Sequence, residues 1–259
     1  MMPSGKSTPV RMNPIRVYEV FGATRHFGGV DATSKLLGLY PIKHGSVILE
    51  IGCGTGYTAC LLAKKYGADV TAIDKSEVFL KKARERAARA GLRGKIRFMN
   101  ANAERLPLGS ESFDIVIAES VLSLCDASAA SAEAFRVLKH GGAFLDNEVT
   151  YLRLPPPSLR NYFRRSLGID ITLLTSMGWK SLFFRAGFRK VTSKALGLNM
   201  FADFSSHIKV YGLAGLIRGS LALLGNSQFR KEYLSPDVLR KWSMMPKYTG
   251  YGLYVCIKY

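Results

Sequence analysis

The segment Glu50–Gly56 reads Glu-Ile-Gly-Cys-Gly-Thr-Gly and joins an apolar run to a stretch with helical periodicity. Its three glycines lack a Cβ atom, so the backbone there can approach a ligand closely, and the amides that open the following helix face the same space. In a doubly wound sheet, such a strand-to-helix turn borders the ligand crevice. We therefore interpret the segment as a ligand cradle; the alternative is that the glycines serve only a tight turn.

The spacing of these glycines distinguishes two classes of ligand. A dinucleotide fingerprint requires Gly-x-Gly-x-x-Gly, and Tyr57 stands where its third glycine would be. An acidic residue followed by Gly-x-Gly-x-Gly instead resembles motif I of the class I S-adenosylmethionine-dependent methyltransferases. The resemblance implies a methyltransferase whose cofactor is S-adenosyl-L-methionine.

Other segments resemble the same family over roughly Val47 to Glu148. Asp74 follows Gly54 by 20 residues, at a position where the family's acid accepts hydrogen bonds from the two ribose hydroxyls, as an acceptor-only carboxylate can. Asn102 stands where the family has an acid that receives the adenine amino group, so a neutral hydrogen bond of about 0.5–1.5 kcal/mol replaces a charge-assisted one. Two further segments look like the family's fourth strand and the turn into its fifth: Ser112–Ser120 and Arg136–Gly142.

Carried over residue by residue, the resemblance gives a set of cofactor-binding positions at the ends of the first four strands. They are Glu50, Gly52, Cys53, Gly54, Gly56, Asp74, Lys75, Asn102, Ala103 and Glu119. Relatives commonly have an apolar residue at the position of Lys75. The methylene stem of this lysine could cover the adenine ring in its place.

Candidates for catalysis follow from the chemistry that the resemblance implies. Methyl transfer from a sulfonium needs mainly alignment of acceptor, methyl and sulfur, which can be worth about 7–11 kcal/mol. A base helps if the acceptor is a phenol, an enol carbon or a protonated amine. Among Glu148, Asp146 and His26, we name Glu148 and His26 as catalytic candidates; the alternatives are a structural hydrogen bond for Glu148 and packing of an N-terminal lid for His26. The spacing of the four cysteines and four histidines predicts no metal site and no disulfide framework.

Short apolar runs alternate with amphipathic stretches of helical length from Ser46 onward. This alternation requires right-handed crossovers, and hence a mostly parallel sheet with helices on both faces. We expect an α/β fold with a Rossmann-like, doubly wound sheet of seven strands. The strands are predicted at 47–51, 69–73, 96–99, 114–118, 143–147, 189–194 and 251–257, and the core helices at 56–65, 77–90, 131–138 and 178–186.

Composition shifts divide the chain into a core and its additions. Residues 1–14 indicate a flexible leader, and residues 15–259 a single methyltransferase domain. Within that domain, 15–45 form an N-terminal helical lid, with short helices expected at Ile15–Phe21 and Val30–Leu39. The core comprises 46–195 and 250–259, and residues 196–249 form a helical insertion that caps the substrate side before the last strand.

Positive charge is concentrated in the C-terminal part of the chain. The net charge is +18, and from Tyr151 onward 17 Lys or Arg stand against four Asp or Glu. Such a surface favours anionic partners such as phospholipid headgroups or nucleic acid. In the insertion one helical face is apolar, formed by Leu213, Leu216, Ile217, Leu221 and Leu224. One interpretation is packing on the domain's own core; the other is a wall of a lipophilic pocket or contact with a membrane.

These patterns favour a methyltransferase for a small acceptor, lipophilic or aromatic, similar to the quinone, sterol and glycine-derivative branch of the family. The alternatives are a tRNA or rRNA methyltransferase that uses the basic C-terminal part, and a non-catalytic module that binds the cofactor. Glu119-Ser120-Val121-Leu122 replaces the Asn/Asp-Pro-Pro-aromatic motif of exocyclic-amine methylation, which disfavours that chemistry. We expect a cytoplasmic protein, peripheral to the membrane at most, because residues 1–14 lack a signal peptide's apolar core and Val210–Gly225 is shorter than the about 20 residues that span a bilayer.

Overall fold

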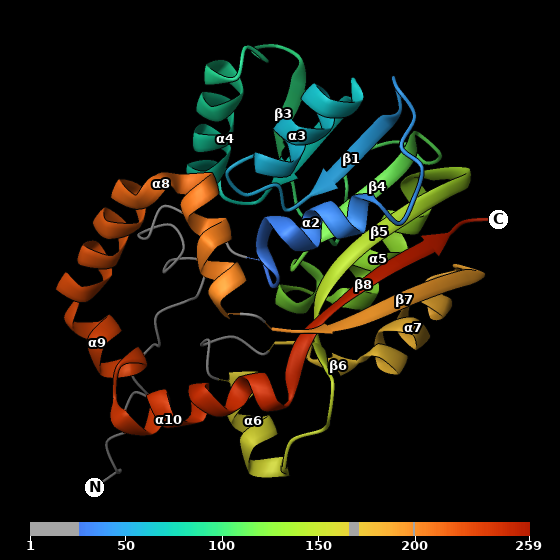
Figure 1. Cartoon of the computed structure of the whole chain (residues 1–259). Coiled ribbons are helices and arrows are strands. Elements are labelled where there is room, and N and C mark those ends of the chain that lie inside the picture. Colours follow the sequence, from blue (N-terminus) through green and yellow to red (C-terminus); the bar gives the residue numbers. More distant parts are fainter. Residues whose placement is uncertain (1–25, 166–170, 199) are drawn as a thin grey trace, which may run out of the picture.

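The computed structural model describes residues 26–165, 171–198 and 200–259. Its central sheet has the order β3-β2-β1-β4-β5-β8-β7, with β6 paired to β5 beside this path (Figure 1). Strands β1 to β5 run parallel, whereas β8 is antiparallel to both β5 and β7. The strands are β1 (Val47–Ile51), β2 (Asp69–Asp74), β3 (Ile96–Asn100), β4 (Phe113–Glu119), β5 (Leu138–Tyr151), β6 (Leu174–Thr175), β7 (Lys190–Gly197) and β8 (Thr249–Ile257). The predicted mostly parallel, doubly wound sheet is confirmed; the seven expected strands form its continuous path, and the two-residue β6 is an addition.

Helices cover both faces of the sheet because its central strands are apolar on both sides. On one face Trp179 and Phe183 pack with Phe144 of β5. On the other, Leu36 and Leu62 belong to the same buried cluster as Leu145, the next residue of that strand. The first face carries α5 (Ala127–Val137) and α7 (Ser176–Arg185), and the second carries α2 (Gly29–Leu37), α3 (Tyr57–Tyr66) and α4 (Glu77–Arg89).

Local sequence signals set the ends of the helices beside the first two strands. Gly56 precedes α3 with φ +75°, and a Cβ atom there would lie 2.8 Å from the Cβ of Ala83 on α4. Glycine therefore allows α3 and α4 to approach each other. The Ser76 side chain accepts a hydrogen bond from the backbone N–H of Phe79 and caps the start of α4.

The insertion before the last strand is helical, as expected. It consists of α8 (Met200–Gly225), α9 (Ser227–Tyr233), α10 (Pro236–Met244) and the short η2 (Met245–Lys247). Figure 1 shows α8, α9 and α10 as an arm beside the sheet. Gly212 has φ +70° and kinks α8 in its middle, and α8 packs against α2.

The apolar face predicted for this insertion is only partly buried. Leu216 is buried, as is its neighbour Leu223, but Leu213, Ile217, Leu221 and Leu224 are exposed. The interpretation that the whole face packs on the core is therefore wrong, because the contact surface of the helix lies along Leu216 and Leu223. Within the described residues we find no helix whose length and apolar character would allow it to cross a membrane.

The N-terminal lid is described from His26 onward. Helix α2 confirms the helix expected at Val30–Leu39, although it ends two residues earlier, at Leu37. The leader 1–14 and the helix expected at Ile15–Phe21 lie outside the described residues. Helix α6 (Pro157–Arg165) begins at the last of three successive prolines.

Candidate active site

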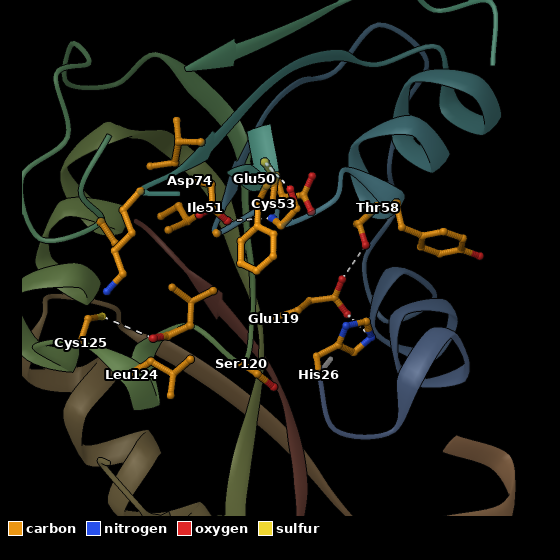
Figure 2. A pocket seen from close by; sticks show the side chains of 18 of the residues that line it. His26, Glu50, Ile51, Cys53, Thr58, Asp74, Glu119, Ser120, Leu124 and Cys125 are labelled. Atoms are coloured by element: carbon orange, nitrogen blue, oxygen red, sulfur yellow. Dashed lines mark hydrogen bonds and ion pairs between the residues drawn. The ribbon is translucent and has the colours of Figure 1, made fainter. Parts of the chain in front are cut away.

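A cavity opens at the carboxyl ends of β1, β2 and β4. Ten of the twelve positions named from the sequence line it, and two do not. Figure 2 shows Asp74, Glu50 and Cys53 close together, with Glu119 between Thr58 and His26. The predicted positions in the lining are His26, Glu50, Gly52, Cys53, Gly54, Asp74, Lys75, Asn102, Ala103 and Glu119.

The glycine segment lines the cavity with backbone atoms. Gly52 has φ +68° and Gly54 has φ +52°, in the left-handed region that favours glycine. A Cβ atom at Gly52 would overlap the side chain of Val121, which lines the same cavity. The backbone N–H of Cys53 donates to the carbonyl oxygen of Ile73 at 2.8 Å and so ties the turn to the neighbouring strand. The turn therefore has a fixed shape, and a larger residue at position 52 would close part of the cavity.

Asp74 holds this turn from the end of β2. Its Oδ2 accepts a hydrogen bond from the backbone N–H of Gly54 at 2.8 Å, and its Oδ1 accepts one from Ser76 N–H at 2.9 Å. Ser76, not Asp74, is the side chain that caps α4. Asp74 is therefore a carboxylate acceptor whose position at the end of β2 is fixed.

Three carboxylates give the lining a negative character in a chain whose net charge is +18. Burial raises the pKa of Glu50 well above its usual range, and the nearby charges of Glu119 and Asp74 raise it further. Among the described residues, Glu50 Oε2 has no hydrogen-bond partner. A cationic ligand group would relieve this repulsion and stabilise the ionised form of Glu50. The cavity thus favours a ligand that carries positive charge near this wall.

Beyond Asp74 the lining becomes apolar. Ile73, Phe79 and Ala103 contribute side chains there, and Lys75 lies exposed at the edge. Asn102 is also exposed, and its Oδ1 already accepts a hydrogen bond from the backbone N–H of Glu104 at 3.1 Å. The amide oxygen has a second lone pair, so it can accept one more donor from a flat ring placed against these residues.

His26, Glu119, Thr33 and Thr58 form a hydrogen-bonded cluster on the other side of the cavity. Thr33 Oγ1 donates to Glu119 Oε2 at 2.7 Å, and Thr58 Oγ1 donates to Oε1 at 2.8 Å. His26 Nε2 lies 3.0 Å from Thr33 Oγ1 and 3.4 Å from Glu119 Oε2. It also lies 2.9 Å from the carbonyl oxygen of Gly29. Four residues from four separate segments therefore share one network.

This network determines which ring nitrogen of neutral His26 carries the hydrogen. The hydroxyl hydrogen of Thr33 is used toward Glu119, and the carbonyl of Gly29 can only accept. Nε2 must therefore be the N–H donor, which leaves Nδ1 as the unprotonated nitrogen. Nδ1 can take a proton, and the carboxylate of Glu119 is placed to balance the charge that results.

The chain segment that carries His26 is held by two hydrogen bonds from the sheet. Phe27 N–H donates to Ser120 Oγ at 3.4 Å, and Asn147 Nδ2 donates to the carbonyl oxygen of Phe27 at 3.0 Å. Ser120 follows Glu119 directly and adopts φ +58°, a conformation uncommon for a residue with a side chain. These contacts fix the start of the described chain over the end of β4.

Comparison with known proteins agrees with this architecture. Residues 49–145 match the family model described as "Methyltransferase domain". The "Uncharacterized methyltransferase YodH" of Bacillus subtilis is 33% identical over 183 residues, which cover 70% of this chain and 77% of that protein. The chain belongs to the class I S-adenosylmethionine-dependent methyltransferases.

Two other proteins are similar to this methyltransferase in part of the sequence or in fold. The "27-O-demethylrifamycin SV methyltransferase" of Amycolatopsis mediterranei is 35% identical over 127 residues, which cover 49% of this chain and 46% of that protein. An S-adenosylmethionine-dependent methyltransferase of Thiobacillus denitrificans, solved with S-adenosyl-L-homocysteine, shares the fold with a TM-score of 0.70 at 18% identity. This match covers 96% of this chain and 100% of that one.

The cofactor of the methyltransferase is S-adenosyl-L-methionine, and the cavity fits its charge distribution. The cofactor carries a positive sulfonium and an ammonium group, and the cavity lining holds three acidic residues, Glu50, Asp74 and Glu119. Within the described part of the chain, Glu50 Oε2 is an unpartnered acceptor on this lining. The absence of a side chain at Gly52 leaves space for the ligand next to the turn. The apolar residues beyond Asp74 suit a flat, weakly polar ring.

Two of the positions named from the sequence do not line the cavity. Gly56 lies at the contact between α3 and α4, where it serves helix packing. Glu148 is fully buried on β5, and its Oε1 accepts a hydrogen bond from the backbone N–H of Leu122 at 2.6 Å. Burial raises the pKa of Glu148 to about 7. This geometry matches the structural alternative for Glu148, since Leu122 begins η1 (Leu122–Leu124), whose last residue lines the cavity.

Several residues of the methyltransferase site were not named from the sequence. Thr58 stands in the first turn after the glycine segment, so its place beside the cavity could have been inferred from that motif. Thr33, Ser206 and Val210 carry no such signal, because they reach the site only through the packing of α2 and α8. Ser120 could have been found only from its backbone conformation, which no sequence pattern reveals.

Proposed function

We propose that the methyltransferase transfers a methyl group to a small acceptor with an apolar or aromatic body, and that His26 removes the acceptor's proton. The observation that carries this proposal is the cluster in which His26 Nε2 contacts Thr33 and Glu119, leaving Nδ1 free of hydrogen. The neighbouring lining is largely apolar, with Val30, Leu124 and Val210. The relative named for 27-O-demethylrifamycin SV supports an acceptor of this size class.

We assign the cofactor to the wall formed by the glycine turn and Asp74, away from His26. Asp74, held by Gly54 and Ser76 N–H groups, receives the ribose hydroxyls. Asn102 and Ala103 contact the adenine ring, and the stem of Lys75 covers its edge. Glu50 and the turn Gly52–Gly54 contact the methionine part, where the buried carboxylate pairs with the ammonium group. We assign Glu119, whose oxygens already contact two threonines, to His26 rather than to the cofactor.

The protein's part in the reaction is to align the acceptor, remove a proton and keep the charge balanced. When bound, S-adenosyl-L-methionine supplies a methyl group already activated by the sulfonium. Nδ1 of His26 accepts the proton of the acceptor's hydroxyl, enol or ammonium group. Glu119 stabilises the imidazolium that forms, as the carboxylate does in a Ser-His-Asp arrangement. General-base catalysis of this kind contributes about 10²–10⁴-fold to the rate.

Incubation of the enzyme with methyl-labelled S-adenosylmethionine tests this function. Three acceptor pools are offered separately: a total lipid extract, an extract of small polar metabolites, and total RNA. We expect label in an extract of small molecules, with most of it in organic-soluble products. Label in RNA alone would contradict the proposal, and so would cofactor binding without transfer to any pool, the behaviour of a non-catalytic module.

The role of His26 is tested by His26→Gln, which preserves hydrogen bonding but cannot accept a proton as imidazole does. We expect kcat to fall by about 10²–10⁴-fold while the affinity for S-adenosylmethionine is unchanged. His140→Gln is the matched control, because His140 is exposed on β5 and contacts Glu111 outside the cavity. Full activity of His26→Gln would rule out His26 as the base.

A further inference from the structure

The second half of α8 exposes a continuous apolar stripe. Leu213, Ile217, Leu221 and Leu224 are 57%, 52%, 64% and 47% exposed. They follow one another at intervals of four, four and three residues, so they lie along one side of the helix over about 17 Å. Leu216 and Leu223, on a different side, are buried against the protein. The stripe is therefore a second apolar face, separate from the one that holds α8 in place.

Exposed cations lie on the same helix as this stripe and on the next one. Arg218 is exposed on α8 next to Ile217, and Arg230 and Lys231 are exposed on α9, which follows α8 directly. Lys209 is exposed on the first half of α8. The sequence contains no Asp or Glu between Asp203 and Glu232. The Lys and Arg residues of this stretch of 28 residues therefore have no acidic residue among them.

We propose that this α8 surface, defined as the apolar stripe with Arg218, Arg230 and Lys231, docks on an anionic lipid bilayer. Aliphatic side chains between basic ones are the composition of helices that lie in the interface of a membrane, with the stripe below the headgroups and the cations among them. In this proposal the helix lies flat in the headgroup region.

The chemistry of the surface separates a bilayer from other anionic or apolar partners. Single-stranded nucleic acid is bound by aromatic side chains that stack on bases, and the stripe is wholly aliphatic. A second copy of this chain would bring two sets of cations together, because a two-fold contact pairs a surface with itself. An anionic bilayer can bury the apolar stripe and pair its headgroups with the cations.

The position of the surface gives docking a consequence for the active site. The first half of α8 lines the cavity through Ser206 and Val210, and Gly212 separates it from the stripe by a kink. A bilayer bound at the stripe would hold the side of the cavity lined by Ser206 and Val210 near the lipid. This consequence rests on the proposed lipophilic acceptor, whereas docking itself does not depend on any acceptor.

Vesicle flotation of the full chain tests the proposal. Vesicles of phosphatidylcholine alone are compared with vesicles in which part of it is replaced by phosphatidylglycerol, at low and at high salt. We expect binding to the anionic vesicles that is about tenfold stronger at low salt and much weaker binding to neutral ones. No flotation with anionic vesicles at low salt would overturn the proposal, as would equal binding to both kinds of vesicle.

Variants locate the contact. The double substitution Ile217→Glu with Leu221→Glu is expected to lower the bound fraction at least about tenfold, and Arg218→Glu with Lys231→Glu about fivefold. Leu39→Glu is the control, because Leu39 is 45% exposed beyond the end of α2. Binding of S-adenosylmethionine reports the fold of each variant and its cofactor wall, so a failure of docking is distinguishable from a failure of the proposed function.

Unchanged vesicle binding by the stripe variant would exclude this surface. A stripe variant that changes the sedimentation of the protein without vesicles would assign the surface to a second copy of the chain and overturn the proposal.

Discussion

One wall of the cavity comes from short segments at successive strand ends between Glu50 and Ala103, whereas a second part of the lining gathers His26, Glu119 and Val210 from three distant segments. The first wall is fixed by backbone hydrogen bonds between neighbouring strand ends. The second is fixed by side chains that connect α2, α3 and β4. The cofactor wall should therefore be sensitive to added atoms near the backbone, and the second wall to the loss of single hydrogen-bonding groups.

Among changes to the cofactor wall, the largest effect is expected from Gly52→Ala. Position 52 has φ +68°, and the added Cβ would overlap Val121, so the turn or Val121 must move within the cavity. A misplacement of this size can reduce function by about 10²-fold, and we expect the affinity for S-adenosylmethionine, measured by calorimetry, to fall at least that much. The control is Gly45→Ala, where φ is +77° but the added Cβ meets no atom within 4 Å. If both variants bind equally, close approach at Gly52 is not what shapes this wall.

A smaller but clear effect is expected from Asp74→Ala. The substitution removes both acceptor oxygens assigned to the ribose and the anchor of Gly54. Charge-assisted hydrogen bonds of this kind are about twice as strong as neutral ones, and we expect the dissociation constant of S-adenosylmethionine to rise at least about tenfold. Asp69→Ala serves as the control, since Asp69 is exposed at the other end of the same strand. Unchanged affinity in Asp74→Ala would remove the ribose assignment.

The two walls also differ in how far the sequence predicts them. The mostly parallel sheet follows from alternating apolar and amphipathic segments. Parallel strand ends meet at one edge of such a sheet, so Glu50, Asp74 and Asn102 could be predicted to lie close together. His26 and Glu119 were both named, but their contact was not predicted. The two residues are 93 positions apart, and His26 lies in a segment without helical or strand periodicity. Packing of this kind depends on tertiary contacts that no local spacing encodes.

The same limit explains the α8 face. Periodicity groups five apolar residues on one side of the helix, but it neither separates the buried Leu216 from the other four nor indicates what covers that side. Four of the five apolar residues are exposed, because the arm formed by α8, α9 and α10 contacts the rest of the molecule through other positions (Figure 1). Glu148 illustrates the opposite case. A carboxylate in an apolar strand suggested chemistry, and burial against Leu122 N–H supplies a structural reason for it.

Thr33→Val and Thr58→Val test which hydrogen bonds hold Glu119 and His26 in place. Both threonines donate to Glu119, but only Thr33 also contacts His26 Nε2. Valine has the same shape without the hydroxyl, and both side chains are buried. We expect Thr33→Val to lower kcat about tenfold and Thr58→Val about threefold, as net hydrogen-bond energies of about 0.5–1.5 kcal/mol allow. Affinity for S-adenosylmethionine should stay unchanged in Thr33→Val. Equal losses in the two variants would show that the link between Thr33 and His26 does not contribute.

The smallest effect is expected from Glu148→Gln and concerns the stability of the fold. Glu148 does not line the cavity, so this substitution tests a residue outside both walls. Burial raises the pKa of Glu148 from 4.5 to about 7, so between these values the folded protein holds a proton that the unfolded chain releases. The contribution of this group is therefore present below about pH 4.5 and is lost as the pH rises through about 7. Glu148→Gln keeps the oxygen that accepts from Leu122 N–H and cannot titrate. Relative to this variant, the melting temperature of the native protein should fall by roughly 5 °C from pH 5 to pH 8. Burial and the nearby charge of Glu148 also raise the pKa of Asp146, so the comparison with Glu148→Gln reports the titration of this carboxylate pair. Calorimetric melting curves that stay parallel over this range would show that Glu148 is ionised in the folded state, and its place beside Leu122 would then be an ion–dipole contact.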